Sequence, residues 1–278
     1  MIAGRKDMQI KYICSMWGMN RPTLKANLEA IKSAGYDGVE TWAPGDATQR
    51  RELRSILDDL GLDLVSQQWT FGNSAEEHIA SFEEQFLRNI ELQPGFINSH
   101  TGVDHYTLAE NLPIFDHARL LAERHGVTVL HETHRGRPTF SAPSTMALLD
   151  ARPHIALTAD FSHWCCVHES LLQDQTGRLQ RASEHAHYIH ARVGHAEGPQ
   201  VPDPRVPEWQ VALNSHLAWW QEIVDIRSRA GTEILSICTE FGPPDYMVRL
   251  PFTGVPISDQ WRINLYMKEY LQQNLKLS

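Results

Sequence analysis

The sequence predicts an α/β fold, a (β/α)8 or TIM barrel, in a single domain spanning residues 1–278. Short runs rich in strand-forming residues alternate eight times with segments of helical apolar spacing, as in a parallel sheet with crossover helices. Until the last interval the runs end about 25 to 33 residues apart, close to the length of one βαβ unit. No G-x-G-x-x-G or P-loop pattern follows the first run, so we favour the barrel over an open doubly wound sheet.

Each expected strand is a short run of apolar, β-branched or aromatic residues. In chain order, the runs are residues 9–17, 36–42, 62–69, 96–100, 127–133, 155–160, 188–193 and 234–240. The segments between them carry apolar stripes that would cover the sheet, such as Leu53, Ile56, Leu57 and Leu60, then Ile79, Phe82, Phe86 and Ile90, then Leu213, Leu217, Trp220 and Val224. A final helix over residues 259–275 is expected to be the eighth and to close the ring.

The composition is that of an acidic globular protein, with 42% hydrophobic and 21% charged residues and a formal net charge of −9. No basic stripe interrupts this negative charge, so we expect no nucleic-acid partner. The first residues lack the apolar core of a signal peptide, and no stretch is long and apolar enough to span a bilayer. A cytoplasmic protein without membrane contact is therefore expected. The four cysteines match no zinc or disulfide spacing and are expected to be free thiols.

Polar side chains gather where the predicted strands end, at the face on which barrel proteins place their functional groups. The last four strands end at Glu132, Asp160, His190 and Glu240, in chain order. Successive side chains of a strand alternate between the barrel interior and the helix layer, so the parity of the neighbours predicts where these four residues point. The four polar residues are left facing inward, because their apolar neighbours take the outward positions. The outward residues are Val127, Val129, Ile155, Leu157, Ala159, Ile189, Ala191, Leu235 and Ile237.

Three carboxylates and one imidazole at a single point would repel one another strongly without a cation. Hard oxygen ligands with one nitrogen suit Mn2+, Mg2+ or Co2+. A lone strand-end carboxylate is more often a helix cap or an ion-pair partner, and a lone His is more often a hydrogen-bonded core residue. Four such groups of matching parity on successive strands favour one bound divalent metal ion. Manganese is preferred, with magnesium, cobalt and zinc as alternatives.

Five segments give the sequence a resemblance to a known family: 34–40 (AGYDGVE), 131–134 (HETH), 158–163 (TADFSH), 190–195 (HARVGH) and 239–243 (TEFGP). Through them nearly the whole chain resembles the xylose-isomerase-like barrels, often labelled sugar phosphate isomerase/epimerase, a superfamily that also contains endonuclease IV. The resemblance implies a homodimer or homotetramer and a substrate contact at His163. It also implies Glu132 and Glu240 as the acid/base pair, within a ligand set of Glu132, Asp160, His190 and Glu240.

Two branches of the superfamily fit the sequence less well. The ketose 3-epimerase branch carries an Arg six residues after the seventh-strand His, where this sequence has Ala196. Arg192 or Arg205 would have to replace that Arg. The endonuclease IV branch uses a three-zinc cluster with additional His and Asp ligands, and the acidic balance of this chain argues against a DNA substrate.

The sequence therefore predicts a metal-dependent isomerase or epimerase that acts on a small sugar or keto-sugar through an enediolate, with Glu132 and Glu240 as catalytic residues. The expected substrate-binding residues lie at or just past strand ends: Trp17, Trp69, His100, His134, His163, Arg192 and His195. Aromatic residues there, including Trp42 and Trp164, either stack on a sugar ring or close the barrel. The long loops at 195–208 and 241–256 are typical of lids, specificity walls or oligomer contacts.

The main alternative is a metal-dependent lyase or decarboxylase acting on an oxidised sugar or sugar acid. An Arg facing a substrate carboxylate would favour it, and the candidates are Arg135, Arg137, Arg192 and Arg249. The absence of a phosphate-binding loop pattern disfavours a phosphorylated substrate. A non-catalytic sugar-binding protein is disfavoured by the complete ligand set, and a nuclease by the negative charge.

Overall fold

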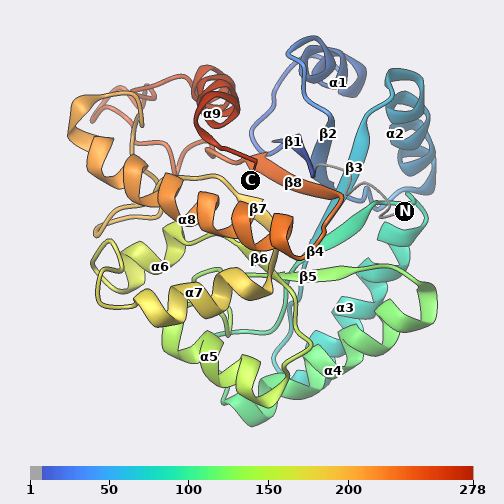
Figure 1. Cartoon of the computed structure of the whole chain (residues 1–278). Helices are drawn as coiled ribbons and strands as arrows, with labels where there is room; N and C mark the ends of the chain where they lie inside the picture. Colours follow the sequence, from blue (N-terminus) through green and yellow to red (C-terminus); the bar gives the residue numbers. More distant parts are fainter. Residues whose placement is uncertain (1–7, 278) are drawn as a thin grey trace, which may run out of the picture.

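The computed structural model describes residues 8–277, which form one closed barrel of parallel strands surrounded by helices (Figure 1). Each strand pairs with the next along the chain, and the last pairs with the first. The strands are β1 (Gln9–Ser15), β2 (Gly38–Trp42), β3 (Asp63–Trp69), β4 (Phe96–His100), β5 (Val129–Glu132), β6 (Leu157–Ala159), β7 (Ala186–His190) and β8 (Ile234–Thr239). The predicted TIM barrel is confirmed. Residues 1–7, on which the signal-peptide expectation rests, and Ser278 lie outside the described part.

Helices connect the strands around the outside of the barrel. They are α1 (Leu24–Ser33), α2 (Ala47–Leu60), α3 (Ala75–Ile90), α4 (Leu108–His125), α5 (Ala142–Ala151), α6 (Ser162–Val167), α7 (Thr176–His185), η1 (Pro207–Trp209), α8 (Gln210–Arg229) and α9 (Gln260–Asn274). The β6–β7 connection contains two helices, α6 and α7, where one was expected. Within residues 8–277, no helix combines the length and the apolar character that crossing a lipid bilayer requires.

Short polar residues and glycines set the helix ends. The Asp46 side chain accepts hydrogen bonds from the first backbone N–H groups of α2, and Thr107 and Glu110 cap α4 reciprocally. Helix α2 ends at Gly61, whose φ of 59° is readily adopted by glycine. These signals set where α2 and α4 begin and where α2 ends.

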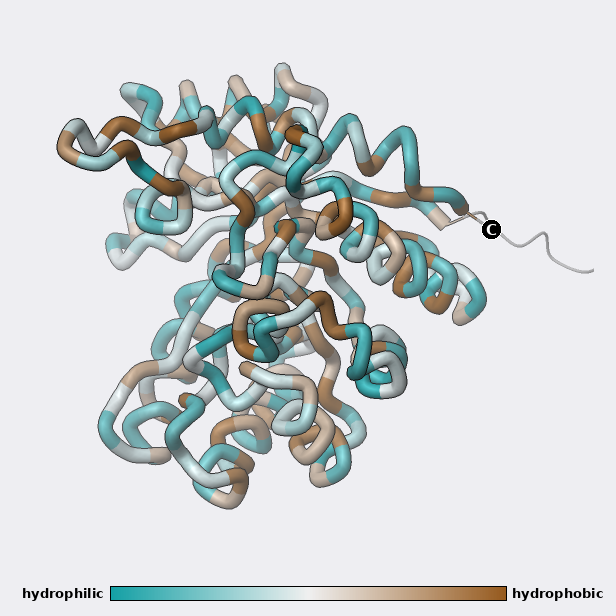
Figure 2. The backbone as a smooth tube through the Cα atoms, turned by 90° about the vertical axis from the view of Figure 1, so that its left-hand side faces the viewer, coloured by the Kyte–Doolittle hydropathy of each residue, from teal (hydrophilic) through white to brown (hydrophobic). Residues whose placement is uncertain are grey.

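Apolar residues pack against the strands in two layers, one inside the barrel and one outside it. One, with a single residue from each of five strands, fills the barrel interior: Ile13, Val65, Leu130, Tyr188 and Cys238. The other lies between strands and helices and contains the expected outward residues Leu157, Ala159, Ile189, Leu235 and Ile237. Figure 2 shows hydrophobic and hydrophilic residues alternating along the helical turns, as amphipathic helices require. The strand parity expected from the sequence is present.

Several strands end earlier than expected. β6 ends at Ala159, β7 at His190 and β8 at Thr239. Asp160 and Glu240 are therefore the first residues beyond their strands. Their side chains lie at the C-terminal end of the barrel, where the loops begin.

Candidate functional site

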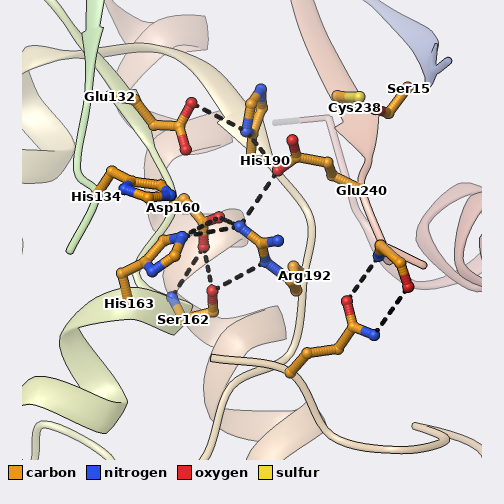
Figure 3. Close-up of polar contacts among 12 residues, drawn as sticks. Ser15, Glu132, His134, Asp160, Ser162, His163, His190, Arg192, Cys238 and Glu240 are labelled. Carbon is orange, nitrogen blue, oxygen red and sulfur yellow. Dashed lines mark hydrogen bonds and ion pairs between the residues drawn. The ribbon is translucent and has the colours of Figure 1, made fainter. Parts of the chain in front are cut away.

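Four polar side chains from consecutive strands meet at the C-terminal end of the barrel (Figure 3). Glu132 ends β5 and His190 ends β7, while Asp160 and Glu240 directly follow β6 and β8. One ligand atom from each residue lies within 4.8 Å of those of the others, and all four residues are buried. Donor atoms around one ion stand up to about 4 to 4.5 Å apart when metal–ligand bonds are about 2.0 to 2.2 Å. The cluster therefore has nearly the dimensions of a metal centre.

Glu40, on β2, fixes the orientation of the His190 ring. His190 Nε2 donates to Glu40 Oε2 at 2.9 Å. The same carboxylate accepts hydrogen bonds from Tyr188 Oη at 2.6 Å and from Asn98 Nδ2 at 3.1 Å. The other ring nitrogen, Nδ1, faces the cluster and lies 2.8 Å from Glu240 Oε2. Burial alone would lower the pKa of His190, but the carboxylates of Glu240 and Glu40 raise it well above its usual value.

The donor set fits a divalent metal ion. His190 Nδ1 and Glu240 Oε2 are buried and lack a hydrogen-bond partner among the described residues, although they face each other as an ion pair at 2.8 Å. Carboxylate oxygens with one imidazole nitrogen suit divalent ions of this kind. A metal-bound His typically donates its second N–H to a carboxylate, as His190 does to Glu40. Glu132, Asp160, His190 and Glu240 are the residues that would hold the ion.

The Glu132 carboxylate is held in its ionised form by its neighbours. Its Oε2 accepts hydrogen bonds from Asn98 Nδ2 at 2.7 Å and from His100 Nε2 at 2.8 Å. Burial raises the pKa of a carboxyl group, but His100 and His190 outweigh that effect and hold the pKa of Glu132 well below its usual range. At neutral pH this side chain is able to accept a proton.

Arg192 pairs with Asp160 from the segment that follows β7. Its Nη2 donates to Asp160 Oδ2 and to His163 Nε2, the latter at 2.9 Å, and lies 3.4 Å from Glu240 Oε2 (Figure 3). Burial raises the pKa of Asp160 to about 6, although the guanidinium acts in the opposite direction. Arg192 therefore offsets part of the negative charge of the cluster.

A cavity of about 350 Å3 opens over the cluster, and we call it the reaction cavity. Seven residues with an expected catalytic or substrate-binding role line it: Trp17, Trp69, His100, Glu132, His134, Arg192 and Glu240. Trp42, Gln67, Arg137 and Tyr246 complete the lining. A larger cavity, of about 640 Å3, lies near the first residues of several strands, at the opposite end of the barrel, and contains none of the four candidate ligands.

His163, the expected substrate contact on α6, lies beneath the wall of the reaction cavity. Its ring is fully buried, with its centroid 3.9 Å from that of His134, which in turn stacks on His100 at 4.5 Å. Burial, together with the nearby His134 and Arg192, lowers the pKa of His163 well below its usual value. The neutral ring accepts a hydrogen bond from Arg192. In this structure His163 positions Arg192 and does not line the cavity.

Two other residues lie away from their expected positions. His195 packs against Trp209, with ring centroids 4.7 Å apart, because the chain after β7 turns back through a backbone bridge between His195 and Gly198. His195 does not line the reaction cavity, so the geometry does not support its expected substrate contact. Trp164 is fully buried on α6, where its Nε1 donates to Thr139 O at 2.9 Å. It packs the barrel top and is not available to a sugar.

The loop after β8 contributes Tyr246 to the reaction cavity. The guanidinium carbons of Arg135 and Arg192 lie 5.0 and 4.9 Å from the centre of its ring, and Trp17 meets the ring edge-on at 4.9 Å. Gly242 permits this approach, because a Cβ at that position would clash with the Trp17 ring. An aromatic residue in a loop has no periodic signal, so the sequence did not indicate Tyr246.

Hydrogen bonds join the two long loops that were expected to form lids or walls. Gly242 N donates to Gln200 Oε1 at 2.7 Å, and Gln200 Nε2 donates to Gly242 O at 3.2 Å. Farther along, Ser258 Oγ donates to Asp203 Oδ2 at 3.3 Å. The two loops therefore support each other beside the cavity.

Of the four Arg candidates for a substrate carboxylate, Arg137 and Arg192 line the reaction cavity. Arg135 lies over Tyr246, and Arg249 is exposed and lines none of the cavities described. Glu40 had no expected role. The sequence could have indicated that Glu40 faces the barrel interior, because its strand neighbour Val39 packs in the outer layer.

Residues 28–246 match the xylose isomerase-like TIM barrel family, and the chain belongs to that family. No curated protein sequence matches the chain. Among solved structures, 3-keto-D-glucoside 4-epimerase from E. coli is similar with a TM-score of 0.65 and 13% identity, covering 95% of this chain and 100% of that one. The probable 3-DHS dehydratase of Bacillus anthracis gives a TM-score of 0.61 and 17% identity, covering 96% and 100%.

A xylose isomerase-like TIM barrel protein from Mycobacterium smegmatis, solved in complex with magnesium, gives a TM-score of 0.64 and 13% identity over 95% of both chains. At these identities the similarity shows the fold. The named neighbours include an epimerase and a probable dehydratase.

Proposed function

We propose that the protein is a divalent-metal-dependent isomerase or epimerase that acts on a small sugar or keto-sugar. The observation that carries the proposal is a cluster of three carboxylates and one imidazole beneath a cavity, in which the buried atoms His190 Nδ1 and Glu240 Oε2 face each other at 2.8 Å and make no hydrogen bond. The E. coli neighbour is named as an epimerase of keto-glucosides, which is chemistry of the same kind. Manganese is the favoured ion, and magnesium, cobalt and zinc suit the same donors.

Proton transfer is the task of the two glutamates. When bound, a divalent ion supplies a Lewis acid that makes a hydrogen beside a substrate carbonyl more acidic. The ionised Glu132 accepts this proton, which converts the substrate to an enediolate. Glu240, on the other side of the substrate, donates a proton that it has taken up from solvent, and Glu132 later releases its own proton to solvent. Return to the opposite face of the same carbon gives the epimer. Return to the former carbonyl carbon gives the isomer, with the proton of the adjacent hydroxyl moving to the former carbonyl oxygen.

Other residues of the reaction cavity bind and orient the substrate. His134 and Arg192 present polar groups to substrate hydroxyls, and Trp17 and Trp69 offer aromatic faces to the C–H groups of a sugar. His100 binds Glu132 Oε2 at 2.8 Å and thereby keeps the carboxylate directed into the cavity. Burial of the glutamates limits the access of water to the reacting carbon.

A lyase or decarboxylase acting on an oxidised sugar or sugar acid is the second candidate. Arg192 Nη1 is buried and has no hydrogen-bond partner in the described chain, and Arg137 lines the same cavity. Both favour a substrate that carries a carboxylate. The B. anthracis neighbour is named as a probable dehydratase. Product analysis with keto-sugars and keto-sugar acids separates an isomer or epimer from loss of water or carbon dioxide.

Exchange of the substrate hydrogen with solvent tests the step that isomerisation and epimerisation share. We expect the manganese-loaded enzyme to introduce deuterium beside the carbonyl of a keto-sugar substrate in D2O, as followed by NMR. Glu132→Gln should abolish this exchange. Full exchange by the variant would contradict the assignment of Glu132. The cytoplasmic location, the homodimer or homotetramer, and the lack of nucleic-acid and membrane partners remain predictions.

A further inference from the structure

A second cavity, of about 290 Å3, adjoins the reaction cavity. The two share three lining residues, Trp42, Gln67 and Trp69, which therefore form the boundary between them. On the far side of this boundary the second cavity is lined by Phe71 and Arg88, and none of the four candidate metal ligands reaches it. The two cavities therefore adjoin, and the far end of the second one differs chemically from the reaction cavity.

Gln67 is the polar group at the boundary; its side-chain amide makes no hydrogen bond to residues 8–277 and stays open to the cavities that it lines. The adjacent Gln68 differs, because Asn89 Nδ2 donates to its Oε1 at 2.8 Å and its Nε2 donates to Ser99 Oγ at 3.4 Å. Both side chains come from β3, but only that of Gln67, which lines both cavities, has no hydrogen-bond partner among the described residues. Gln67 is therefore free to hydrogen-bond to a ligand that extends across the boundary.

Aromatic rings dominate the walls of the second cavity. Trp42 and Trp69 pack edge to face with ring centroids 5.7 Å apart, and they remain 38% and 40% exposed. Phe71, two residues beyond the end of β3, is 53% exposed. Adjacent large apolar side chains left in contact with water mark binding surfaces. The flat C–H face of a pyranose ring packs against such rings while its hydroxyls stay free for an amide.

The charge and size of the second cavity indicate what it would hold. Arg88 is its only charged lining residue among those described, and the guanidinium is paired with Glu84 at 2.8 Å. The second cavity therefore offers no free charge to a carboxylate or phosphate, unlike the reaction cavity with its carboxylates and Arg192. At about 30 Å3 per water in the liquid, it accommodates about ten non-hydrogen atoms, close to one sugar ring.

We propose that the substrate carries a second sugar unit, with its reacting sugar over the metal-ligand cluster and its linked ring in the second cavity. The linked ring packs against Trp69 and Phe71, and Gln67 hydrogen-bonds to hydroxyls near the glycosidic linkage. This inference rests on the proposed function, since it takes the reaction cavity as the site of the reacting sugar. In addition to the proposed function, we infer that the protein discriminates disaccharides from monosaccharides through residues remote from the metal-ligand cluster.

Binding of disaccharides by the full chain tests the inference without turnover. The probes are maltose, cellobiose, lactose and melibiose, each compared with the corresponding methyl monosaccharide glycoside by calorimetry and saturation-transfer NMR. Each titration is made with manganese and again with EDTA. We expect at least one disaccharide to bind tenfold or more tightly than its methyl glycoside, with saturation transfer to both rings.

In Phe71→Ala the disaccharide advantage should fall to threefold or less. The matched control is Phe252→Ala, which truncates an exposed phenylalanine that lines neither cavity and should keep the full advantage. Equal affinity for all disaccharides and methyl glycosides, or an advantage that survives Phe71→Ala, would overturn the inference. Because binding is also measured with EDTA, a protein that lacks metal-dependent activity but still prefers disaccharides would refute the proposed function and leave the second sugar site standing.

Discussion

Glu40 holds one nitrogen of the His190 ring by a hydrogen bond, a contact that we call the clamp, and the other ring nitrogen makes no hydrogen bond. Its Nε2 donates to Glu40 Oε2 at 2.9 Å, while its Nδ1 faces Glu240 Oε2 at 2.8 Å without forming a hydrogen bond. The clamp spans the barrel interior from β2 to β7. It selects the nitrogen that is directed to the candidate metal centre.

Replacing Glu40 with Gln should weaken metal binding without unfolding the protein. The amide removes the negative charge that orients His190. Its NH2 group would also face one of the hydrogen-bond donors, Tyr188 Oη or Asn98 Nδ2, that now donate to the Glu40 carboxylate. Loss of such an outer partner costs about 10- to 100-fold in metal affinity. Calorimetric titration with Mn2+ measures the change, and the exposed Glu52→Gln is the control. An unchanged Mn2+ affinity in Glu40→Gln would show that the clamp has no part in metal binding.

At saturating Mn2+, Glu132→Gln and Glu240→Gln should each lower kcat by about 100- to 10,000-fold, the range that a general acid or base contributes. Glutamine preserves the size of each side chain but cannot exchange a proton. Steady-state kinetics on the substrate found by screening, with circular dichroism as the check on folding, measures the loss. Wild-type kcat in either folded variant would remove that residue from the mechanism.

Arg192→Met should destabilise the metal-free protein by about 3 to 5 kcal/mol, because it leaves the buried Asp160 without its charged partner. Urea unfolding gives the free energy. The surface pair Arg205 and Asp203 provides the control, since Arg205→Met breaks a more exposed ion pair worth at most about 1 kcal/mol. Added Mn2+ should restore part of the lost stability, because it supplies positive charge to Asp160. Equal losses in the two variants would contradict this view of the cluster.

Acid should destabilise the protein through His216 on α8. This ring is fully buried, its Nε2 accepts a hydrogen bond from Gly194 N at 3.2 Å, and burial lowers its pKa to about 4. The unfolded chain, with a pKa near 6.5, binds the proton first, so the stability contribution is full above pH 6.5 and is lost as the pH falls toward 4. Between pH 7 and pH 4.5 the loss from this group is about 2 to 3 kcal/mol.

The variant His216→Gln keeps an acceptor for Gly194 but cannot take up a proton. Its free energy of unfolding in urea should therefore fall less between pH 7 and pH 4.5 than that of the wild type. Identical pH dependence in the two proteins would mean that His216 is already protonated in the folded state or is accessible to solvent.

Strand periodicity explains how much of this structure could be predicted. The alternation around Leu157, Ile189 and Ile237 reports which way each strand faces, because those residues pack in the outer layer. The same alternation therefore located the four polar residues of the cluster. It could not show that Glu40 clamps His190, since that contact joins residues 150 positions apart across the barrel.

Residues beyond the strand ends were harder to place, because there the chain no longer alternates. His195 follows β7 closely, yet the turn to Gly198 directs its ring toward Trp209. His163 and Trp164 follow β6 on the short helix α6, which buries both. A position just after a strand end in the sequence did not predict where the side chain points when the next residues formed a tight turn or a helix.

The most direct test of the central claim is the metal content of the purified wild type, measured by elemental analysis beside Glu240→Gln and Asp160→Asn with each fold checked by circular dichroism. We predict about one divalent ion per wild-type chain, or stoichiometric uptake of added Mn2+, and clear loss of the ion from both folded variants. A wild-type protein that contains no metal and takes up none would contradict the claim that these four residues form a metal centre.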